Sequence, residues 1–239
     1  MANHQPHLQS LMDLSKVFVV IPAYNEGKSI ASTLEAVLKA GDYSIVVVDD
    51  ASADDTCAVV ETFPVTLLRH EHNRGQGAAL RTGMQYALEN GAEYVVHFDA
   101  DGQHPVEAIE QSLRMLREQA CDVVIGTRFK RKQDRRAIPP LRRWILRLSI
   151  VFNGLVTGVW LSDSHNGFRC MNRKAAAVMR FRQDRMAHAT EVLSIIKTHR
   201  LVVREIPIHV RYFRKDSFKG LLKRMAEVVG DMLFRRRKT

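Results

Sequence analysis

Cysteine is scarce in this chain, and its three cysteines form no recognisable set. Cys57, Cys121 and Cys170 lie far apart among 239 residues, without the spacing of a metal site or of a redox pair. The pattern therefore gives no sign of cysteine-based metal or redox chemistry. Reduced thiols in a cytoplasmic protein are the simplest interpretation.

Long hydrophobic runs are missing as well. The first sixteen residues are polar and lack the apolar core of a signal peptide, so we expect residues 1–16 to be a flexible tail. The longest apolar-rich stretch, residues 144–161, contains Arg147 and Asn153 and is a poor candidate for a membrane span.

Acidic residues are too few to balance the basic ones. The chain has 36 lysines and arginines against 26 aspartates and glutamates, which gives a net charge of +10. This balance indicates an anionic partner, such as nucleic acid, an anionic membrane surface or a phosphorylated substrate. Neither a complete Walker A motif nor a complete G-x-G-x-x-G motif is present, so bound phosphates must be met by a metal ion and by basic side chains.

Apolar runs and helical patterns alternate through the first half of the chain. Strands are expected at residues 17–21, 45–48, 65–68, 94–98 and 122–126, and helices at residues 27–40, 54–62, 77–90 and 106–119. This alternation predicts an α/β fold whose mostly parallel sheet is covered by helices on both faces.

Two carboxylates follow the fourth expected strand. Asp99 and Asp101 are spaced to lie on one side of an extended backbone, and Gln103 adds an amide oxygen. These are hard oxygen ligands that suit Mg2+ or Mn2+ holding nucleotide phosphates. The alternative interpretation is a pair of aspartates that caps the next helix.

Polar clusters also follow the other expected strands, at residues 22–26, 49–56, 73–77 and 126–129. The carboxyl ends of parallel strands meet at one edge of a sheet, and ligands bind outside that edge in open α/β sheets. The sequence therefore predicts one composite site at this edge.

The segments VIPAYNE, VVDDASADDT, NRGQGAALRTG, FDADGQHP and GTRF together resemble family-2 glycosyltransferases of the GT-A (Rossmann-like) fold, over roughly residues 17–220. Within that family the chain is most similar to polyprenyl-phosphate sugar synthases of the dolichyl-phosphate mannose synthase kind. The resemblance implies inverting transfer of a hexose from GDP-mannose or a UDP-hexose to a lipid phosphate. It places the protein on the cytoplasmic face of the cell membrane.

The resemblance also assigns roles to residues that match the family motifs. Metal ligands would be Asp99, Asp101 and Gln103. Donor binding would involve Pro22, Tyr24, Glu26, Val48, Asp50, Asp99, Ala100, Asp101, Arg128, Arg214 and Lys219. Acceptor binding would involve Asp163, Arg169 and Arg211, although a structural Asp163–Arg169 ion pair is an equal alternative.

Catalytic roles fall to Asp101, Arg128 and Glu191 under the same resemblance. Glu191 stands where related glycosyltransferases carry a general base, but a phosphate acceptor is already ionised at neutral pH and needs none. His104 is expected to orient the Asp99–Asp101 loop. Two segments depart from the family: Asn166 replaces a usual serine, and residues 214–219 lack a usual glycine.

The second half of the chain carries surface signals. Residues 216–239 predict a basic amphipathic helix for an anionic membrane surface, following a glycosyltransferase domain at residues 17–215. Packing on the domain, a homodimer contact and a small membrane protein partner are the alternatives for that helix. Residues 144–161 predict a second interfacial element, with a shared face of Ile145, Leu148, Val151, Phe152 and Leu155.

Three other functions stay open at this point. The first is a glycosyltransferase that acts on a glycan or a soluble acceptor, and the second is a nucleotidyltransferase. The third is a non-enzymatic nucleic-acid-binding module, which the charge of +10 suggests. Nucleic acid is not the expected partner, because the carboxylates of the predicted edge would repel its phosphates unless a metal ion were bound.

Overall fold

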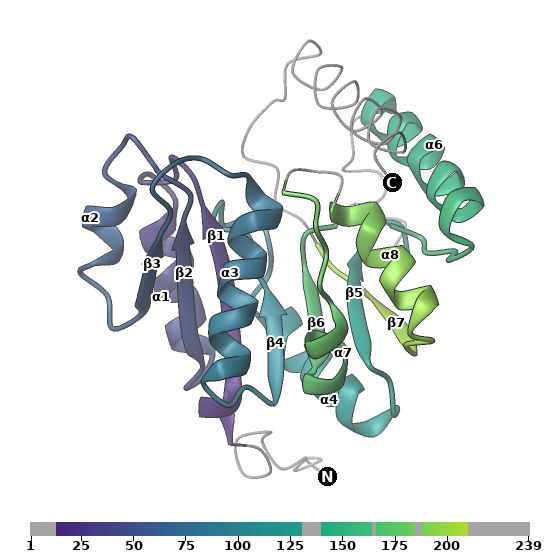
Figure 1. Ribbon diagram of the computed structural model, residues 1–239, viewed down its shortest axis with the longest axis horizontal. Coiled ribbons are helices and arrows are strands. Elements are labelled where there is room, and N and C mark those ends of the chain that lie inside the picture. The colour runs from purple at the N-terminus through teal and green to yellow at the C-terminus, as the bar shows by residue number, and fades with distance from the viewer. Residues whose placement is uncertain (1–12, 131–139, 164–165, 185–187, 210–239) are drawn as a thin grey trace, which may run out of the picture.

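The computed structural model describes residues 13–130, 140–163, 166–184 and 188–209 (Figure 1). The expected C-terminal helix and the candidate residues Arg211, Arg214 and Lys219 lie outside the described residues. The expected boundary of the N-terminal tail needs correction, because residues 13–16 belong to the fold. Leu14–Lys16 form a 3-10 helix, and Leu14 is buried in the core.

Seven strands form one sheet in the order β3-β2-β1-β4-β6-β5-β7. Within the described residues, β6 alone runs antiparallel to its neighbours, β4 and β5. The mostly parallel sheet is therefore confirmed. The strands are β1 (Val17–Ala23), β2 (Ser44–Asp49), β3 (Thr66–Arg69), β4 (Tyr94–His97), β5 (Val123–Thr127), β6 (Arg169–Asn172) and β7 (Val203–Pro207).

Helices cover both faces of the sheet, as the alternating pattern predicts. One face packs against α1 (Ile30–Ala40), α2 (Thr56–Val60) and α4 (Glu107–Glu118). The other face, which is turned toward the viewer in Figure 1, packs against α3 (Gln76–Glu89), α7 (Arg173–Val178) and α8 (His188–Thr198). The remaining helix, α6 (Pro140–Thr157), lies against α8.

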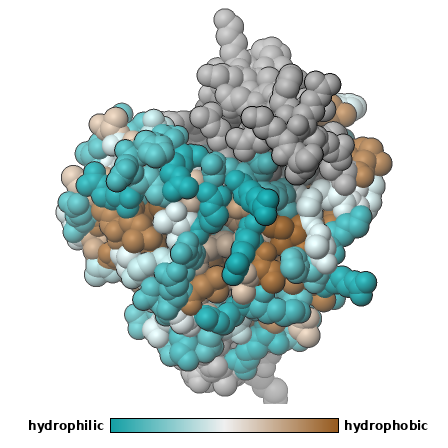
Figure 2. Space-filling view, viewed as in Figure 1, coloured by the Kyte–Doolittle hydropathy of each residue, from teal (hydrophilic) through white to brown (hydrophobic). Residues whose placement is uncertain are grey.

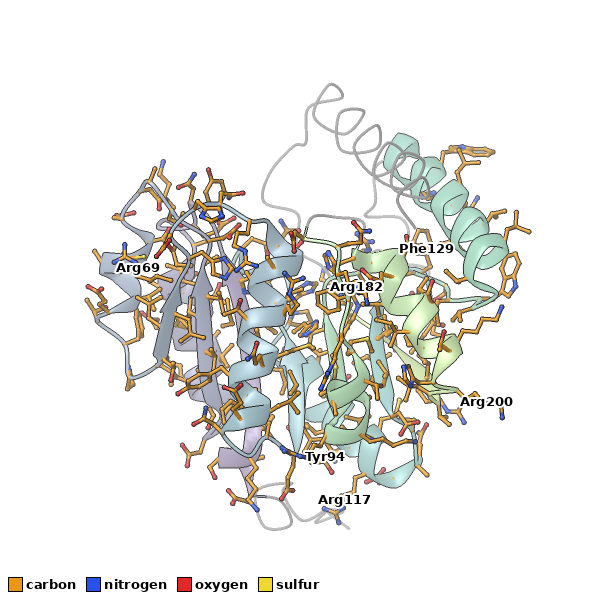
Figure 3. The ribbon with its side chains drawn as sticks, in the orientation of Figure 1. Arg69, Tyr94, Arg117, Phe129, Arg182 and Arg200 are labelled. Atoms are coloured by element: carbon orange, nitrogen blue, oxygen red, sulfur yellow. The ribbon has the colours of Figure 1, made fainter. Side chains whose placement is uncertain are left out.

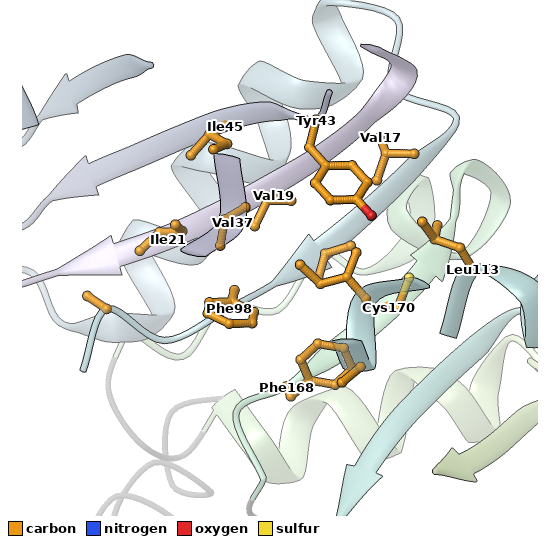
Figure 4. Close-up of a cluster of buried hydrophobic side chains, with 14 of the residues drawn as sticks. Val17, Val19, Ile21, Val37, Tyr43, Ile45, Phe98, Leu113, Phe168 and Cys170 are labelled. Atoms are coloured by element: carbon orange, nitrogen blue, oxygen red, sulfur yellow. The ribbon is translucent and has the colours of Figure 1, made fainter. Parts of the chain in front are cut away.

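The apolar core follows from the two-residue repeat of the strands. On β1, Val17, Val19 and Ile21 point into one core cluster (Figure 4), while Phe18 and Val20 point into the cluster on the other face. A strand buried on both faces needs a continuous apolar run, which is what the sequence shows. The platform that carries the strand ends is therefore packed from both sides.

Close packing by glycine fixes α3 relative to the sheet. A Cβ atom at Gly83 would overlap Cγ1 of Val20 and approach Cγ2 of Val48, so the helix lies close to β1 and β2. A Cβ atom at Gly77 would overlap the carbonyl oxygen of Gln183. These contacts hold the first turn of α3 between the ends of the strands and residues 183–184. Among the helices that the structure describes, none is long and apolar enough to cross a membrane.

Candidate active site

The predicted polar clusters meet at the edge where the parallel strands end. Tyr94 begins β4 at the opposite edge, whereas Phe129 follows the end of β5 (Figure 3). The loops after β1 and β2 are joined there by hydrogen bonds: Asn25 N donates to Ser52 Oγ at 2.9 Å, and Glu26 N donates to Thr56 Oγ1 at 2.9 Å. Together these loops form one wall of the site.

Tyr24 lies on this wall and is 48% exposed, so its ring is accessible to a ligand. Pro22 is partly exposed next to it, at the end of β1. Both residues therefore lie where the sequence places the nucleotide pocket.

Asp50 holds the glycine-rich turn in place. Its carboxylate accepts hydrogen bonds from His70 Nδ1 at 2.7 Å, Arg74 N at 2.9 Å and Gly75 N at 2.6 Å. The second ring nitrogen of His70 bonds Thr82 Oγ1 on α3 at 2.9 Å. Asp50 is only 3% exposed, and its carboxylate is committed to positioning the loop before α3.

The side chain of Val48 is buried as well. Its side chain is fully buried in the core beneath α3, so it does not reach the surface on which a nucleotide would bind. The family resemblance assigns donor contacts to Val48 and Asp50, and the structure shows that both side chains are buried. Contact with the donor through these two residues stays a prediction.

Asp99 is fixed by two side chains from different parts of the chain. Gln76 Nε2, at the start of α3, donates to Asp99 Oδ1 at 3.1 Å, and His104 Nε2 bonds Asp99 Oδ2 at 2.8 Å. Gly167 packs so closely that a Cβ atom there would overlap the same carboxylate. Burial alone would raise the pKa of Asp99, but His104 and the charge of Arg169 hold that pKa below its ordinary value.

His104 therefore orients the loop, as the sequence predicts. Its ring packs edge-on against Phe98, with ring centroids 5.8 Å apart, and against Phe168 at 6.0 Å. The hydrogen bond from Gln76 to Asp99 was not predicted, because a glutamine in a glycine-rich turn gives no indication of its partner.

Asp101 is the less committed carboxylate of the pair. Gln103 N donates to Asp101 Oδ1 at 3.0 Å, and the other oxygen accepts no hydrogen bond from the part of the chain that the structure describes. Burial and the negative charge of Asp99 raise the pKa of Asp101, and Glu26 adds to this effect. The loop itself is anchored by a hydrogen bond from Thr33 Oγ1 to the carbonyl of Ala100 at 3.0 Å.

These residues could supply some, but not all, of the ligands of a divalent cation. In the described ranges, no three His, Cys, Asp or Glu side chains gather closely enough to hold a metal ion alone. A carboxylate oxygen without a partner and an amide nearby suit Mg2+ or Mn2+, which commonly take their remaining ligands from substrate phosphates and water. Burial and the charge of Asp99 disfavour the ionised form of Asp101, and a bound cation would offset that penalty.

Arg128 and Asp163 form a buried pair. Arg128 Nε and Nη2 donate to the two oxygens of Asp163 at 2.6 and 2.8 Å, and Asp163 is fully buried. The sequence suggested an ion pair between Asp163 and Arg169, but the basic partner of Asp163 is Arg128. The bidentate geometry joins the end of β5 to the segment before β6.

The carboxylate of Glu191 accepts hydrogen bonds from backbone N–H groups. Both of its carboxylate oxygens accept from Arg182 N at 2.8 Å, and one accepts from Gln183 N at 2.8 Å. Figure 3 shows Arg182 between α3 and α8. Arg81 on α3 binds the same segment, through Asp184 Oδ1 at 2.6 Å. The sequence carries no signal for these contacts, which depend on residues 182–184 lying against both α3 and α8.

The electrostatics of Asp101 give a test of cation binding. A folded-state pKa above the unfolded value means that the protonated carboxyl favours folding at low pH, and this contribution is lost as the pH rises through the raised pKa. At pH 7 we expect Asp101→Asn to be at least as stable as the wild type without metal. Mn2+ at a hundredfold excess over its Kd should stabilise the wild type by about 3 kcal/mol, but not the variant.

Thermal unfolding with and without Mn2+ measures both effects. Asp42→Asn is the matched control, because Asp42 is exposed away from the site and should leave the Mn2+ response unchanged. An equal Mn2+ response in Asp101→Asn and the wild type would show that the ion binds elsewhere.

Comparisons with known proteins agree with this geometry. The model of "Glycosyl transferase family 2" matches residues 18–179. An uncharacterised protein of Methanocaldococcus jannaschii is 34% identical over 208 residues, covering 86% of this chain and 85% of the relative. The UDP-N-acetylglucosamine–dolichyl-phosphate N-acetylglucosaminyltransferase of Methanococcus voltae is 29% identical, covering 85% and 89%. The undecaprenyl-phosphate mannosyltransferase of Micrococcus luteus is 27% identical, covering 90% of each.

Solved structures show the same fold at lower identity. Glucosyl-3-phosphoglycerate synthase from Mycobacterium tuberculosis, in complex with Mn2+, UDP and glucosyl-3-phosphoglycerate, superposes with a TM-score of 0.67 at 19% identity. The match covers 92% of this chain and 79% of that structure. The match of the family model over most of the chain, together with the site geometry, shows that this protein is an enzyme of glycosyltransferase family 2 with the GT-A fold.

Proposed function

We propose that this enzyme transfers a hexose, with inversion, from a nucleotide sugar to the phosphate of a polyprenyl phosphate at a membrane surface. The donor would be GDP-mannose or a UDP-hexose. One observation carries the proposal. An oxygen of Asp101, at the edge where the parallel strands end, accepts no hydrogen bond from the described residues, whereas both oxygens of Asp99 accept hydrogen bonds. Relatives named for transfer to dolichyl phosphate and undecaprenyl phosphate match nearly the whole chain and support the acceptor class.

The site residues divide the work of the reaction. An acceptor phosphate oxygen forms a bond to the anomeric carbon, and the anomeric C–O bond breaks with its electron pair passing to the nucleoside diphosphate. Asp101 and Gln103 would hold Mg2+ or Mn2+, which supplies Lewis-acid stabilisation of the leaving diphosphate when bound. Asp99, expected as a third ligand, has both oxygens engaged and instead positions the loop.

The walls of the site would bind the rest of the donor. Pro22, Tyr24 and Glu26 lie on the nucleotide side, and the backbone of Ala100 lies between the two aspartates. Arg128 would contact the diphosphate or the donor sugar from the end of β5, where Asp163 holds its guanidinium in place.

The position of Glu191 agrees with an acceptor that is already ionised. A general base must reach the proton that it removes, but this carboxylate binds two backbone N–H groups. A phosphate acceptor carries no proton that must be removed at neutral pH. Glu191 would therefore shape the segment beside α3 rather than take a proton.

The exposed face of α6 supports binding to a membrane surface. Trp144, Leu148, Val151 and Leu155 recur every three or four residues and are between 48% and 73% exposed. Figure 1 places α6 at the end of the molecule where the parallel strands end, and Figure 2 shows apolar residues on the surface there. Leu148, Val151 and Leu155 are the members of the face expected for residues 144–161 whose side chains are described, and all three are exposed.

Basic and aromatic side chains complete this α6 face. Arg147 is exposed on the same helix, and Trp160 is 62% exposed beside Gly154, where a Cβ atom would come within 2.6 Å of the indole. Apolar side chains flanked by arginine and tryptophan are typical of helices that lie in the interface of an anionic membrane. The α6 face would bring the site to the inner surface of the cell membrane, where a lipid phosphate is presented.

Glu191→Gln separates a positioning role from general-base catalysis. The amide oxygen of glutamine still accepts a backbone N–H, so we expect kcat to stay within about tenfold of the wild type. A general base contributes roughly 10²–10⁴-fold. Glu191→Ala should lose more than Glu191→Gln, with an unchanged pH profile of kcat/KM. Loss of the acidic limb of that profile in Glu191→Gln would instead identify a base.

Transfer itself is tested with labelled nucleotide sugars, Mn2+ and undecaprenyl phosphate. We expect a labelled lipid whose formation requires the divalent cation and whose sugar has the inverted anomeric configuration. Undecaprenol, which lacks the phosphate, is the matched control and should remain unlabelled. Labelling of a saccharide or a soluble acceptor, with none in the lipid, would contradict the proposed acceptor.

Membrane binding is tested with vesicles that contain anionic lipid. Leu148→Glu replaces an apolar contact by a charge that the surface repels, so it should weaken vesicle binding about tenfold or more. Val202→Glu is the control, because Val202 is an exposed apolar residue outside α6. Co-sedimentation measures both variants, and equal weakening by the two would remove the special role of α6.

A further inference from the structure

The first turn of α3 has no capping side chain of its own. Its N-cap residue is Gly75, which has no side chain, although the N–H groups that begin a helix need acceptors. Gln76, the first residue of the helix, donates to Asp99 and so helps to anchor the Asp99–Asp101 loop. Contacts from elsewhere in the chain must therefore hold this turn in place.

Residues 181–184 supply those contacts, and we call them the 181–184 segment. The carbonyl oxygen of Asp184 accepts a hydrogen bond from Ala78 N at 3.2 Å, in the first turn of α3. Gly77 allows this close approach, because a Cβ atom there would overlap the carbonyl oxygen of Gln183. Figure 1 shows this part of the chain between α3 and α8, running toward the edge where the parallel strands end.

Arg81 fastens the 181–184 segment to α3. Its Nη1 atom donates to the carbonyl oxygen of Phe181 at 3.2 Å, and its Nη2 atom donates to Asp184 Oδ1 at 2.6 Å. Arg81 follows Gly77 and Ala78 by four and three residues, so all three lie on one face of the helix. The contacts of this face therefore act together on the same short segment.

The Arg81–Asp184 ion pair should do little for stability by itself. Its side chains are 30% and 42% exposed, and solvent screens an ion pair of that kind. The Arg114–Glu110 pair on α4 is closely similar, with its atoms 2.7 Å apart and its side chains 33% and 42% exposed. Arg81 differs from Arg114 in the segment that it holds. A comparison of the two pairs therefore separates a positioning role from general stabilisation.

We propose that Arg81 is a positioning residue of the active site. By holding the 181–184 segment against the first turn of α3, Arg81 keeps the amide of Gln76 on Asp99 and the Asp99–Asp101 loop in place for transfer. The guanidinium of Arg81 is bound to the segment, so it acts through Gln76 rather than on the substrate. The kinetic part of the test below rests on the proposed function.

A double-mutant cycle on the full-length enzyme tests this route. Arg81→Ala and Gln76→Ala should each lower kcat for transfer to undecaprenyl phosphate about tenfold or more, because a misplacement of about 1 Å can cost about a hundredfold. The double variant should be no slower than the slower single variant, since both changes break one chain of contacts. The KM for the nucleotide sugar should stay unchanged.

Two further variants complete the series. Arg81→Lys keeps a positive charge beside Asp184, so it should recover part of the kcat that Arg81→Ala loses. Arg114→Ala removes the matched ion pair on α4 and should keep the kcat of the wild type. The unfolding temperature should fall by at most about 4 °C in Arg81→Ala and Arg114→Ala alike.

Hydrogen exchange of the metal-free enzyme tests the same route without a substrate. In Arg81→Ala the amide of Ala78 loses its fixed acceptor and should exchange faster than in the wild type. The amide of Gln103, which donates to Asp101 in the anchored loop, should follow it. The amide of Leu113 on α4 is the internal control and should exchange at the rate of the wild type.

Three results would overturn the inference. The first is a double variant in which the two losses of kcat multiply in full. The second is an Arg81→Ala variant that keeps the kcat of the wild type or loses no more than Arg114→Ala. The third is unchanged exchange at Ala78 and Gln103. If exchange changes as expected but the wild type glycosylates no undecaprenyl phosphate, the positioning role stands and the proposed acceptor fails.

Discussion

The anchored carboxylate of Asp99 is the interaction on which the rest of the site depends. Gln76 binds one oxygen from the start of α3, His104 binds the other, and Gly167 packs against the group from the segment before β6. Three separate parts of the chain therefore meet at one carboxylate. Since Asp99 is fixed in this way, Asp101 keeps an oxygen without a protein partner and is free to bind a cation.

The antiparallel strand β6 brings side chains from separate parts of the sheet together. Its insertion between β4 and β5 places Arg169 opposite His97, on the far side of β4 from the nucleotide wall. The same insertion brings Asp163 to Arg128 at the end of β5. Asp163 therefore pairs with Arg128, whereas Arg169 Nη1 has no hydrogen-bond partner among the described residues.

The sequence predicts this fold well where the signal is local. The apolar runs around Val19 and Val96 mark strands buried on both faces, and the convergence of their polar ends follows from parallel pairing. His104 bonds Asp99, as an orienting role requires. This contact was predictable because the two residues are only five positions apart in the sequence. The partners of Arg128 and the antiparallel course of β6 were not predictable, because they depend on strand order across the sheet. The burial of the Val48 side chain was not predictable either, because a residue at a strand end can point to either face of the sheet.

Anomalous diffraction from crystals grown with Mn2+ and a nucleoside diphosphate tests the central claim, that Asp99 positions the loop while Asp101 binds the cation. The account predicts one manganese peak at the strand-end edge, bonded to Asp101, with Asp99 still bound to Gln76 and His104. Manganese bonded to Asp99 with His104 displaced, or no manganese peak at this edge, would contradict it.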